Sequence, residues 1–257
     1  MKINVVFIIL LLSGCTSKPL FYNDFSPPKD SKQVNIAVEA PAIAEVLPLN
    51  VMYRSYKCQV SSRISEREYR DVPGFHNMEI LLNRQGNTNV FAKNIPLDGG
   101  GRCDWRLSNI ITSLKFSKAH PLSINVDSFI GRNLVFIFDT NPPKITGGRI
   151  NKTKGNLYIS KKYFPWLDKN SKSNKLTLEL FGGQLYEYYE ISQPQKTLWK
   201  PIIPEGVYVT SEYTGNPELD KQGKFARYSD GTVSQGDSND EMYKKLLLLT
   251  SEGTAND

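Results

Sequence analysis

Residues 103–108 read Cys-Asp-Trp-Arg-Leu-Ser, and residues 56–61 read Tyr-Lys-Cys-Gln-Val-Ser. In both stretches apolar side chains alternate with polar ones. This period of two is typical of a β-strand, because successive strand side chains point to opposite faces. Each apolar set contains one cysteine, Cys58 or Cys103. We therefore expect two strands that each bury one face, with a cysteine on that face.

Short runs rich in Val, Ile, Tyr and Phe recur along the rest of the chain, separated by turn-forming Gly, Pro and Asn. The Gly182-Gly183 pair between two such runs predicts a β-hairpin. The expected strands are 51–60, 78–83, 88–93, 122–126, 134–138, 157–160, 176–181, 185–191 and 207–211.

Helical patterns are few. Residues 107–114 are expected to form one or two helical turns. Near the C-terminus, Ser238 and Glu241 have the spacing of a capping box, which predicts a helix that ends at Gly253. The apolar face of this helix is Met242, Leu246 and Leu249. The expected fold class is mainly β with minor helix, sandwich-like, with a C-terminal helix.

Composition narrows the functional classes. The chain has 257 residues, 39% of them hydrophobic and 23% charged, which is enough to bury a core and excludes intrinsic disorder. The net charge of +6 is spread thinly along the chain, so we expect no nucleic-acid partner. Fifteen prolines and eighteen glycines argue against a helical bundle.

The first fifteen residues carry the strongest signal. After Lys2 comes the nearly continuous apolar run 3–12, followed by Leu12-Ser13-Gly14-Cys15. A membrane-spanning helix needs about 20 apolar residues, so this run suits the hydrophobic region of a secretory signal instead. The tetrapeptide resembles the lipobox of bacterial lipoproteins. The resemblance covers only this prefix, and a signal peptide with a chance cysteine is the alternative.

The lipobox resemblance implies that residues 1–14 are a signal peptide and that Cys15 is the acylated first residue of the mature chain. Fatty acyl chains such as palmitate would hold it in a membrane, because two or more chains anchor stably. In that class a residue other than Asp after the cysteine directs the product to the outer membrane, and here Thr16 follows. We expect a location in the cell envelope, facing the periplasm. Residues 15–33 are polar and contain Pro27-Pro28, which predicts a disordered, lipidated tether.

Beyond Cys15 the chain contains two cysteines, Cys58 and Cys103. In an oxidising compartment an even pair is typical of a disulfide rather than of a metal or catalytic site. The bond would close a loop of about 46 residues and stabilise the fold by about 4 kcal/mol. We expect it to be buried beside Trp105. Two free buried thiols are the alternative.

Domain division is weakly marked. Residues 139–155 contain turn-forming residues and few large apolar ones. They are expected to join a disulfide-bearing β subdomain, residues 34–140, to a second β subdomain with the C-terminal helix, residues 156–257. One continuous β domain is the alternative. Residues 215–240 are polar and are expected to form a long surface loop.

Catalytic signals are sparse. The two histidines, His76 and His120, lie in turn-like sequence and have no second histidine at helical spacing, which excludes a helix-borne zinc pair. Nucleophile-elbow and phosphate-loop motifs are missing from the sequence. Gly99–Gly101 is expected to be a flexible turn rather than an anion site. Glu187 and Glu190 flank two tyrosines without a specific pattern. We therefore expect no catalytic residue, metal site or cofactor.

Three functional classes remain. Aromatic residues make up 11% of the chain, and Tyr and Trp are frequent at protein interfaces as well as in β cores. The first class is a non-catalytic envelope lipoprotein that binds another protein. A lipobox, a tether, a β-rich body and no catalytic motif are similar in outline to immunity lipoproteins. This likeness implies occlusion of a periplasm-acting antibacterial toxin, such as one delivered by type VI secretion.

The second class is a structural or accessory lipoprotein of an envelope assembly or secretion apparatus. The third is an envelope hydrolase whose site is not local in sequence. Its candidate residues are His76, His120, Glu187 and Glu190.

Overall fold

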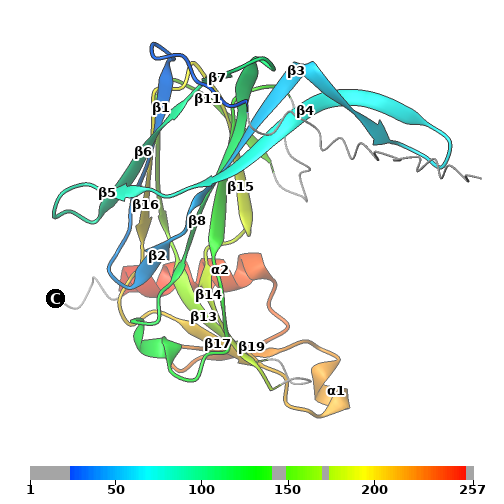
Figure 1. Cartoon of the computed structure of the whole chain (residues 1–257). Coiled ribbons are helices and arrows are strands. Elements are labelled where there is room, and N and C mark those ends of the chain that lie inside the picture. The colour runs from blue at the N-terminus through cyan, green and yellow to red at the C-terminus, as the bar shows by residue number, and fades with distance from the viewer. Residues whose placement is uncertain (1–23, 141–148, 170–173, 253–257) are drawn as a thin grey trace, which may run out of the picture.

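The computed structural model describes residues 24–140, 149–169 and 174–252. The protein is mainly β, with 55% strand and 9% helix, and its sheets pack in a sandwich-like arrangement with one C-terminal helix (Figure 1). The expected fold class is therefore confirmed. Within these residues, no helix combines the length and apolar character that a membrane crossing requires.

Three sheets make up the fold. Sheet A has the order β11 (Ile150–Lys154), β15 (Tyr186–Ser192), β10 (Arg132–Ile137), β8 (Trp105–Phe116), β3 (Leu49–Arg63), β4 (Tyr69–Ile80), with β2 (Ala44–Val46) and β7 (Asp98–Gly100) also paired to β8. Sheet B has the order β12 (Leu157–Lys162), β16 (Lys196–Ile202), β1 (Gln33–Glu39), β6 (Val90–Pro96), β5 (Asn83–Arg84). Sheet C has the order β19 (Val233–Gln235), β18 (Phe225–Tyr228), β17 (Val209–Glu212), β13 (Phe164–Lys169), β14 (Leu176–Phe181), β9 (Ser128–Ile130).

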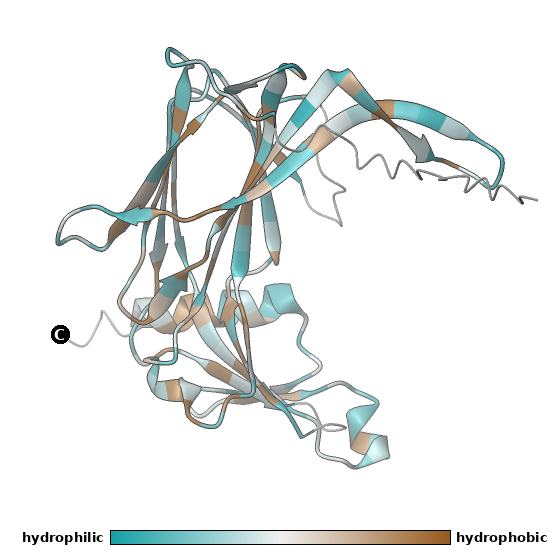
Figure 2. Cartoon of the chain, in the orientation of Figure 1, coloured by the Kyte–Doolittle hydropathy of each residue, from teal (hydrophilic) through white to brown (hydrophobic). Residues whose placement is uncertain are grey.

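One core joins sheets A and B. Apolar side chains of both sheets belong to a single buried cluster, and Figure 2 shows hydrophobic residues along these strands. The cluster takes Val34, Ile36, Val38, Ile95 and Trp199 from sheet B, and Leu49, Val51, Tyr53, Ile110, Leu114, Leu134 and Phe136 from sheet A. Two amphipathic sheets that bury their apolar faces against each other form a sandwich.

Sheet C lies at one end of this sandwich (Figure 1). One of its faces is covered by the C-terminal helix α2 (Asn239–Glu252), whose Met242 and Leu246 are buried against the sheet. The opposite face contributes Leu178 and Leu180 to the sandwich core. A buried ion pair between Arg132 on β10 and Glu179 on β14 also links sheets A and C.

The expected division of the chain does not divide the sheets. In sheet B, β1 pairs in parallel with β16, and in sheet A, β10 pairs in parallel with β15. Residues 34–140 and 156–257 thus contribute strands to the same sheets.

Two local predictions were wrong, each for its own reason. Residues 107–114 are not helical but belong to β8, which is flanked by β3 and β10 and buries both faces over much of its length. The Gly182-Gly183 pair does not make a hairpin. It connects β14 of sheet C to β15 of sheet A.

Two further segments differ from expectation. Residues 122–126 contain the end of a 3₁₀ helix, Pro121–Ser123, because the His120 imidazole caps its first turn and Pro121 suits a helix start. Residues 215–240 are not a plain loop. They include the short helix α1 (Pro217–Asp220). They also include the strands β18 and β19, which extend sheet C.

The C-terminal helix is confirmed with its predicted start. The Ser238 backbone N–H donates to Glu241 Oε2 at 2.8 Å, and the Glu241 N–H donates back to Ser238 Oγ at 3.3 Å. This reciprocal pair is the capping box. The helix is described to residue 252, so its expected end at Gly253 lies outside the described residues.

Candidate partner-binding arm

Strands β3 and β4 continue beyond sheet A as a two-stranded ribbon that projects from the body (Figure 1). Strand β8 pairs with β3 only as far as Arg54. Farther out, Gln59–Arg63 pairs with Tyr69–Pro73, and neither strand has a second neighbour among the described residues. We call residues 55–73 the arm. A ribbon with two open edges offers side chains on both faces to a partner.

The arm exposes some side chains of types that are frequent at protein interfaces. Its large side chains are exposed: Tyr56 by 63%, Ile64 by 57% and Tyr69 by 64%. Tyrosine and arginine are enriched where proteins bind one another, because each offers a large contact area together with a hydrogen-bonding group. Farther along β4, Phe75 is exposed too, and an even spacing places it on the same face as Tyr69.

The charges of the arm are not neutralised by the body. Its basic residues are Lys57, Arg63, Arg67 and Arg70, and its acidic residues are Glu66, Glu68 and Asp71. None of these side chains forms an ion pair with another residue that the structure describes. Charged side chains and Pro73 also protect the open edges against unspecific strand pairing, because they disfavour addition of another strand.

The predicted Cys58–Cys103 disulfide is confirmed, and it lies at the root of the arm. Cys103 and Trp105 are both buried, as expected. The local geometry differs from the prediction at two points. The pairing of β3 shifts between Ser55 and Gln59, so Tyr56 is exposed instead of sharing a buried face with Cys58. Cys103 lies in a turn before β8, not on the strand.

This root is held by more than the covalent bond. Ser55 accepts a hydrogen bond from the Cys58 N–H at 2.8 Å and donates to the Cys103 carbonyl. An isolated two-stranded hairpin is only marginally stable in water. Because no third described strand pairs with the arm, the disulfide and the Ser55 bridge strengthen its connection to sheet A.

Residues 24–33 do not form the expected disordered tether. The Ser26 N–H donates to the Gly99 carbonyl at 2.9 Å, and Asp24 accepts from the Arg102 N–H and forms an ion pair with its side chain. The Phe25 ring packs edge-on against Tyr53, with 4.8 Å between ring centroids. The remainder of the expected tether, including Cys15, lies outside the described residues.

Gly99–Gly101 is where this segment docks, and not a free flexible turn. A Cβ at Gly99 would overlap the Phe25 ring, and a Cβ at Gly100 would overlap the Ser26 carbonyl oxygen. At Gly101 a Cβ would overlap the Asp24 carbonyl oxygen. Only glycine leaves room for such a close backbone approach, and Gly100 and Gly101 also have positive φ values of 59° and 70°.

His76 lies in β4 at the arm root, not in the expected turn. Its imidazole stacks on the Phe25 ring at 5.6 Å and lies 5.7 Å from the Trp105 ring. Its Nδ1 is buried without a hydrogen-bond partner in the described residues. Burial lowers the pKa of His76 because the protonated imidazole would lose its hydration.

The other residues considered for a hydrolase site make separate structural contacts. His120 is buried against Phe116, and burial lowers its pKa. Glu187 binds Lys161 at 2.6 Å and accepts from the Tyr189 hydroxyl at 3.1 Å.

Glu190 pairs instead with Lys152, and its spacing of three from Glu187 places the two carboxylates on opposite faces of β15. No contact brings these acids and the histidines together in the described part of the chain. The same residues contain no cluster of three or more potential metal ligands.

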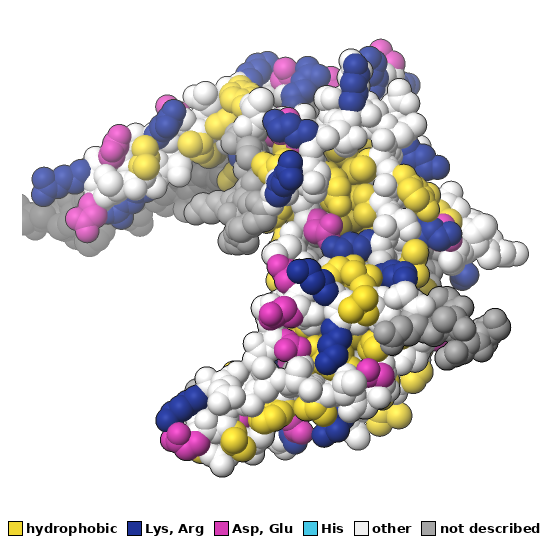
Figure 3. Space-filling model, turned by 180° about the vertical axis from the view of Figure 1, so that it is seen from behind, with side chains coloured by type: hydrophobic (Ala, Val, Ile, Leu, Met, Phe, Trp, Pro, Cys, Tyr) yellow, Lys and Arg dark blue, Asp and Glu magenta, His cyan; other side chains and the backbone are white. Residues whose placement is uncertain are grey.

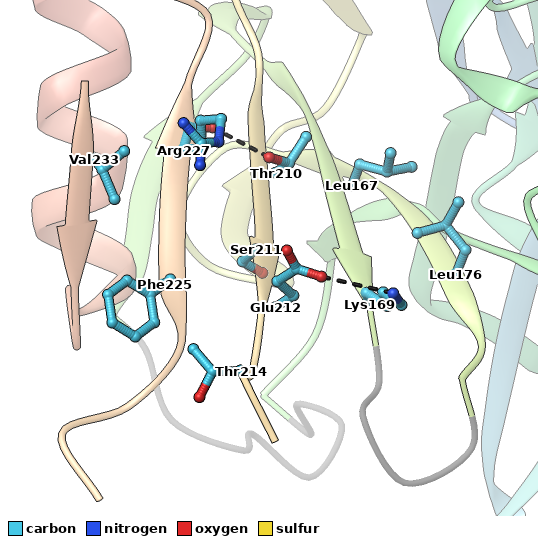
Figure 4. A pocket seen from close by; sticks show the side chains of 10 residues that line it. All are labelled: Leu167, Lys169, Leu176, Thr210, Ser211, Glu212, Thr214, Phe225, Arg227 and Val233. Atoms are coloured by element: carbon cyan, nitrogen blue, oxygen red, sulfur yellow. Dashed lines mark hydrogen bonds and ion pairs between the residues drawn. The ribbon is translucent and has the colours of Figure 1, made fainter. Parts of the chain in front are cut away.

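A second surface feature is a groove of about 380 Å³ on sheet C (Figure 4). Its walls are apolar and come from Leu167, Leu176, Phe225 and Val233. Two of its charged groups, Lys169 and Glu212, pair with each other at 3.6 Å. The lining contains no buried polar atom without a partner.

The arm and the sheet C end of the molecule project on the same side, with a hollow between them (Figure 3). Several large aromatic residues lie in the core instead of on the surface. Tyr163, Phe164 and Trp199 are fully buried core residues. The arm was not predicted as a site, because its sequence is polar and its exposure follows only from where β8 stops pairing with β3.

The comparisons with known proteins give no match. No protein-family model matches this chain, and neither a curated protein nor a solved structure matches it.

Proposed function

We propose that this protein is a membrane-anchored periplasmic lipoprotein that acts by binding another protein through its arm. In its most concrete form it is an immunity protein that blocks a periplasm-acting antibacterial toxin by occlusion, such as a toxin delivered by type VI secretion. The observation that carries the proposal is the projecting ribbon of residues 55–73 with exposed Tyr56 and Tyr69.

Occlusion needs a projection that enters or covers the mouth of an active site and stays rigid there. The disulfide at the arm root supports this role because it limits the freedom of a ribbon that would be marginal alone. Rigid side chains lose less entropy on binding. Tyrosine has only two side-chain torsions, so it contributes contact area at low entropic cost.

Binding is also the role that best fits the chemistry. His76 and His120 are packed against aromatic rings, and Glu187 and Glu190 are paired with lysines. A hydrolase would need these groups to converge on one reacting atom. The arm, in contrast, presents aromatic rings to the solvent, together with charges that form no ion pair with any residue the structure describes.

The test is contact-dependent competition on a surface. The gene is deleted while a neighbouring toxin gene stays intact, and the mutant is grown beside toxin-bearing siblings. We expect the mutant to be killed, and the wild-type gene to restore survival. A Tyr56→Ser, Tyr69→Ser double variant should restore at least tenfold fewer survivors. Tyr158→Ser is the matched control, because Tyr158 is 60% exposed on β12 in sheet B.

Normal growth of the deletion mutant beside its siblings would contradict the immunity role. If the purified protein captured components of a secretion or pilus apparatus in place of one toxin, the accessory-lipoprotein role would be supported instead. Full rescue by the tyrosine double variant would show that the arm is not the binding surface.

A further inference from the structure

The segment Asp24–Ser26 joins the arm at its root. Phe25 contacts β3 and β4 next to the arm root, packing on Tyr53 of β3 and stacking on His76 of β4. Its backbone is bound to the Gly99–Gly101 stretch, and Ser26 forms an isolated parallel bridge with Gly100. The chain therefore enters the folded body beside the disulfide and not at β1, which begins at Gln33.

Three features identify this contact as specific. Three consecutive glycines leave the space that the segment fills, so the body is shaped to receive it. The Asp24 carboxylate binds the Arg102 N–H and the Arg102 side chain. Downstream, Ser31 Oγ donates to the Asp98 carbonyl at 3.2 Å, and the Leu97 N–H donates to the Lys32 carbonyl at 2.8 Å.

We propose that Asp24–Ser26 is a latch that holds the arm close to the bilayer, so that the arm meets a partner working at the membrane surface. This inference rests on the proposed acylation of Cys15. Asp24 lies nine positions after Cys15, and a fully extended chain over that distance reaches about 30 Å. If the chain were free as far as Gln33, its reach would be about 60 Å.

The latch sets position as well as distance. Because Phe25 lies against β3 and β4 next to the arm root, a tether that ends at Asp24 would be attached to the body at that root. The arm would then be held near the point of attachment. A partner that works at the bilayer, such as a protein that attacks or inserts into lipid, comes within reach of the arm. A partner that stays more than about 30 Å from the bilayer comes within reach of the arm less readily.

Energy transfer tests the latch in the full-length acylated protein. The protein is placed in vesicles of phosphatidylethanolamine and phosphatidylglycerol, with a donor dye on the arm at Ser62→Cys and an acceptor on the lipid headgroups. Ser62 is exposed, so the dye does not disturb the core. A nine-residue Gly/Ser insertion is then made at one of two places, between Asn23 and Asp24 or between Lys29 and Asp30.

The latch predicts different results for the two insertions. The upstream insertion lengthens the tether outside the latch, so energy transfer should fall at least twofold. The downstream insertion lies between the latch and β1 in an exposed turn, so energy transfer should stay at the wild-type value. Equal losses from both insertions would overturn the latch, because a free tether responds to its total length.

Two controls separate the possible failures. Phe25→Ser should lower energy transfer while Pro27→Ala, at an exposed neighbouring position, should not. A protein that does not sediment with the vesicles would contradict the anchor and thus the proposed location, whereas vesicle binding with equal insertions contradicts only the latch. In the competition assay, the upstream insertion alone should lower survival. Full survival of the upstream-insertion strain as well as the downstream-insertion strain would contradict the inference that the partner works at the membrane surface.

Discussion

Replacing Cys58 and Cys103 together with alanine should lower the free energy of unfolding by about 4 kcal/mol. The disulfide joins residues 45 positions apart in the sequence. Closing a loop of that size removes roughly 13 cal/mol/K of entropy from the unfolded chain, which is about 4 kcal/mol at 25 °C. The arm should respond most, because beyond Arg54 no third strand of the described ranges supports it.

Urea unfolding measures the total effect, and hydrogen exchange measures its location. We expect the amides of Gln59–Arg63 and Tyr69–Pro73 to lose more protection than those of β8. A Ser61→Ala, Ser62→Ala double variant is the control, because both serines are exposed on the arm and far from the core. A loss of less than about 1 kcal/mol, or uniform loss of protection across sheet A, would refute the claim that the disulfide braces the arm.

Three other perturbations test the account. Burial lowers the pKa of His76 below its value in the unfolded chain, so the stability that the neutral imidazole contributes is present above about pH 6.5 and is lost as the pH falls through the folded pKa. The free energy of unfolding, followed from pH 7.5 to 5, should depend less on pH in His76→Phe than in the wild type. An unchanged slope would contradict this role of His76. Glu179→Gln leaves the buried Arg132 without its counter-charge and should cost about 3 kcal/mol in urea unfolding, whereas Arg132→Met with Glu179→Leu should cost much less; equal losses would refute the ion-pair explanation. Ser238→Ala removes the capping box of α2 and should cost about 1 kcal/mol, and calorimetry that detects no change would show that tertiary packing alone holds the helix.

Local sequence patterns predicted several elements well. The strand 176–181 has the bounds that the structure shows, and the strand expected at 185–191 differs by one residue at each end. The capping box at Ser238 predicted the start of α2 because it depends only on nearby residues. The disulfide could be predicted because the chain offers only two cysteines beyond Cys15.

Features that depend on long-range pairing could not be predicted in the same way. The hairpin expected at Gly182-Gly183 failed because β14 and β15 find partners in different sheets. Burial on both faces hid the strand character of residues 107–114. The arm could not be predicted because it depends on where β8 stops pairing with β3, at Arg54. The role of Gly99–Gly101 depends on residues 24–26, which are distant in sequence and occupy the space that the missing Cβ atoms leave.

Site-specific photo-crosslinking in living cells tests the central claim most directly. A photoreactive amino acid replaces Tyr69 on the arm or, as the control, Tyr158 on β12, which is exposed to a similar extent. If the arm binds the partner, illumination should give one discrete adduct from position 69, containing the toxin encoded by the neighbouring gene, and none from position 158. Adducts of equal yield at both positions, or an adduct at position 158 alone, would contradict the assignment of the arm as the binding surface.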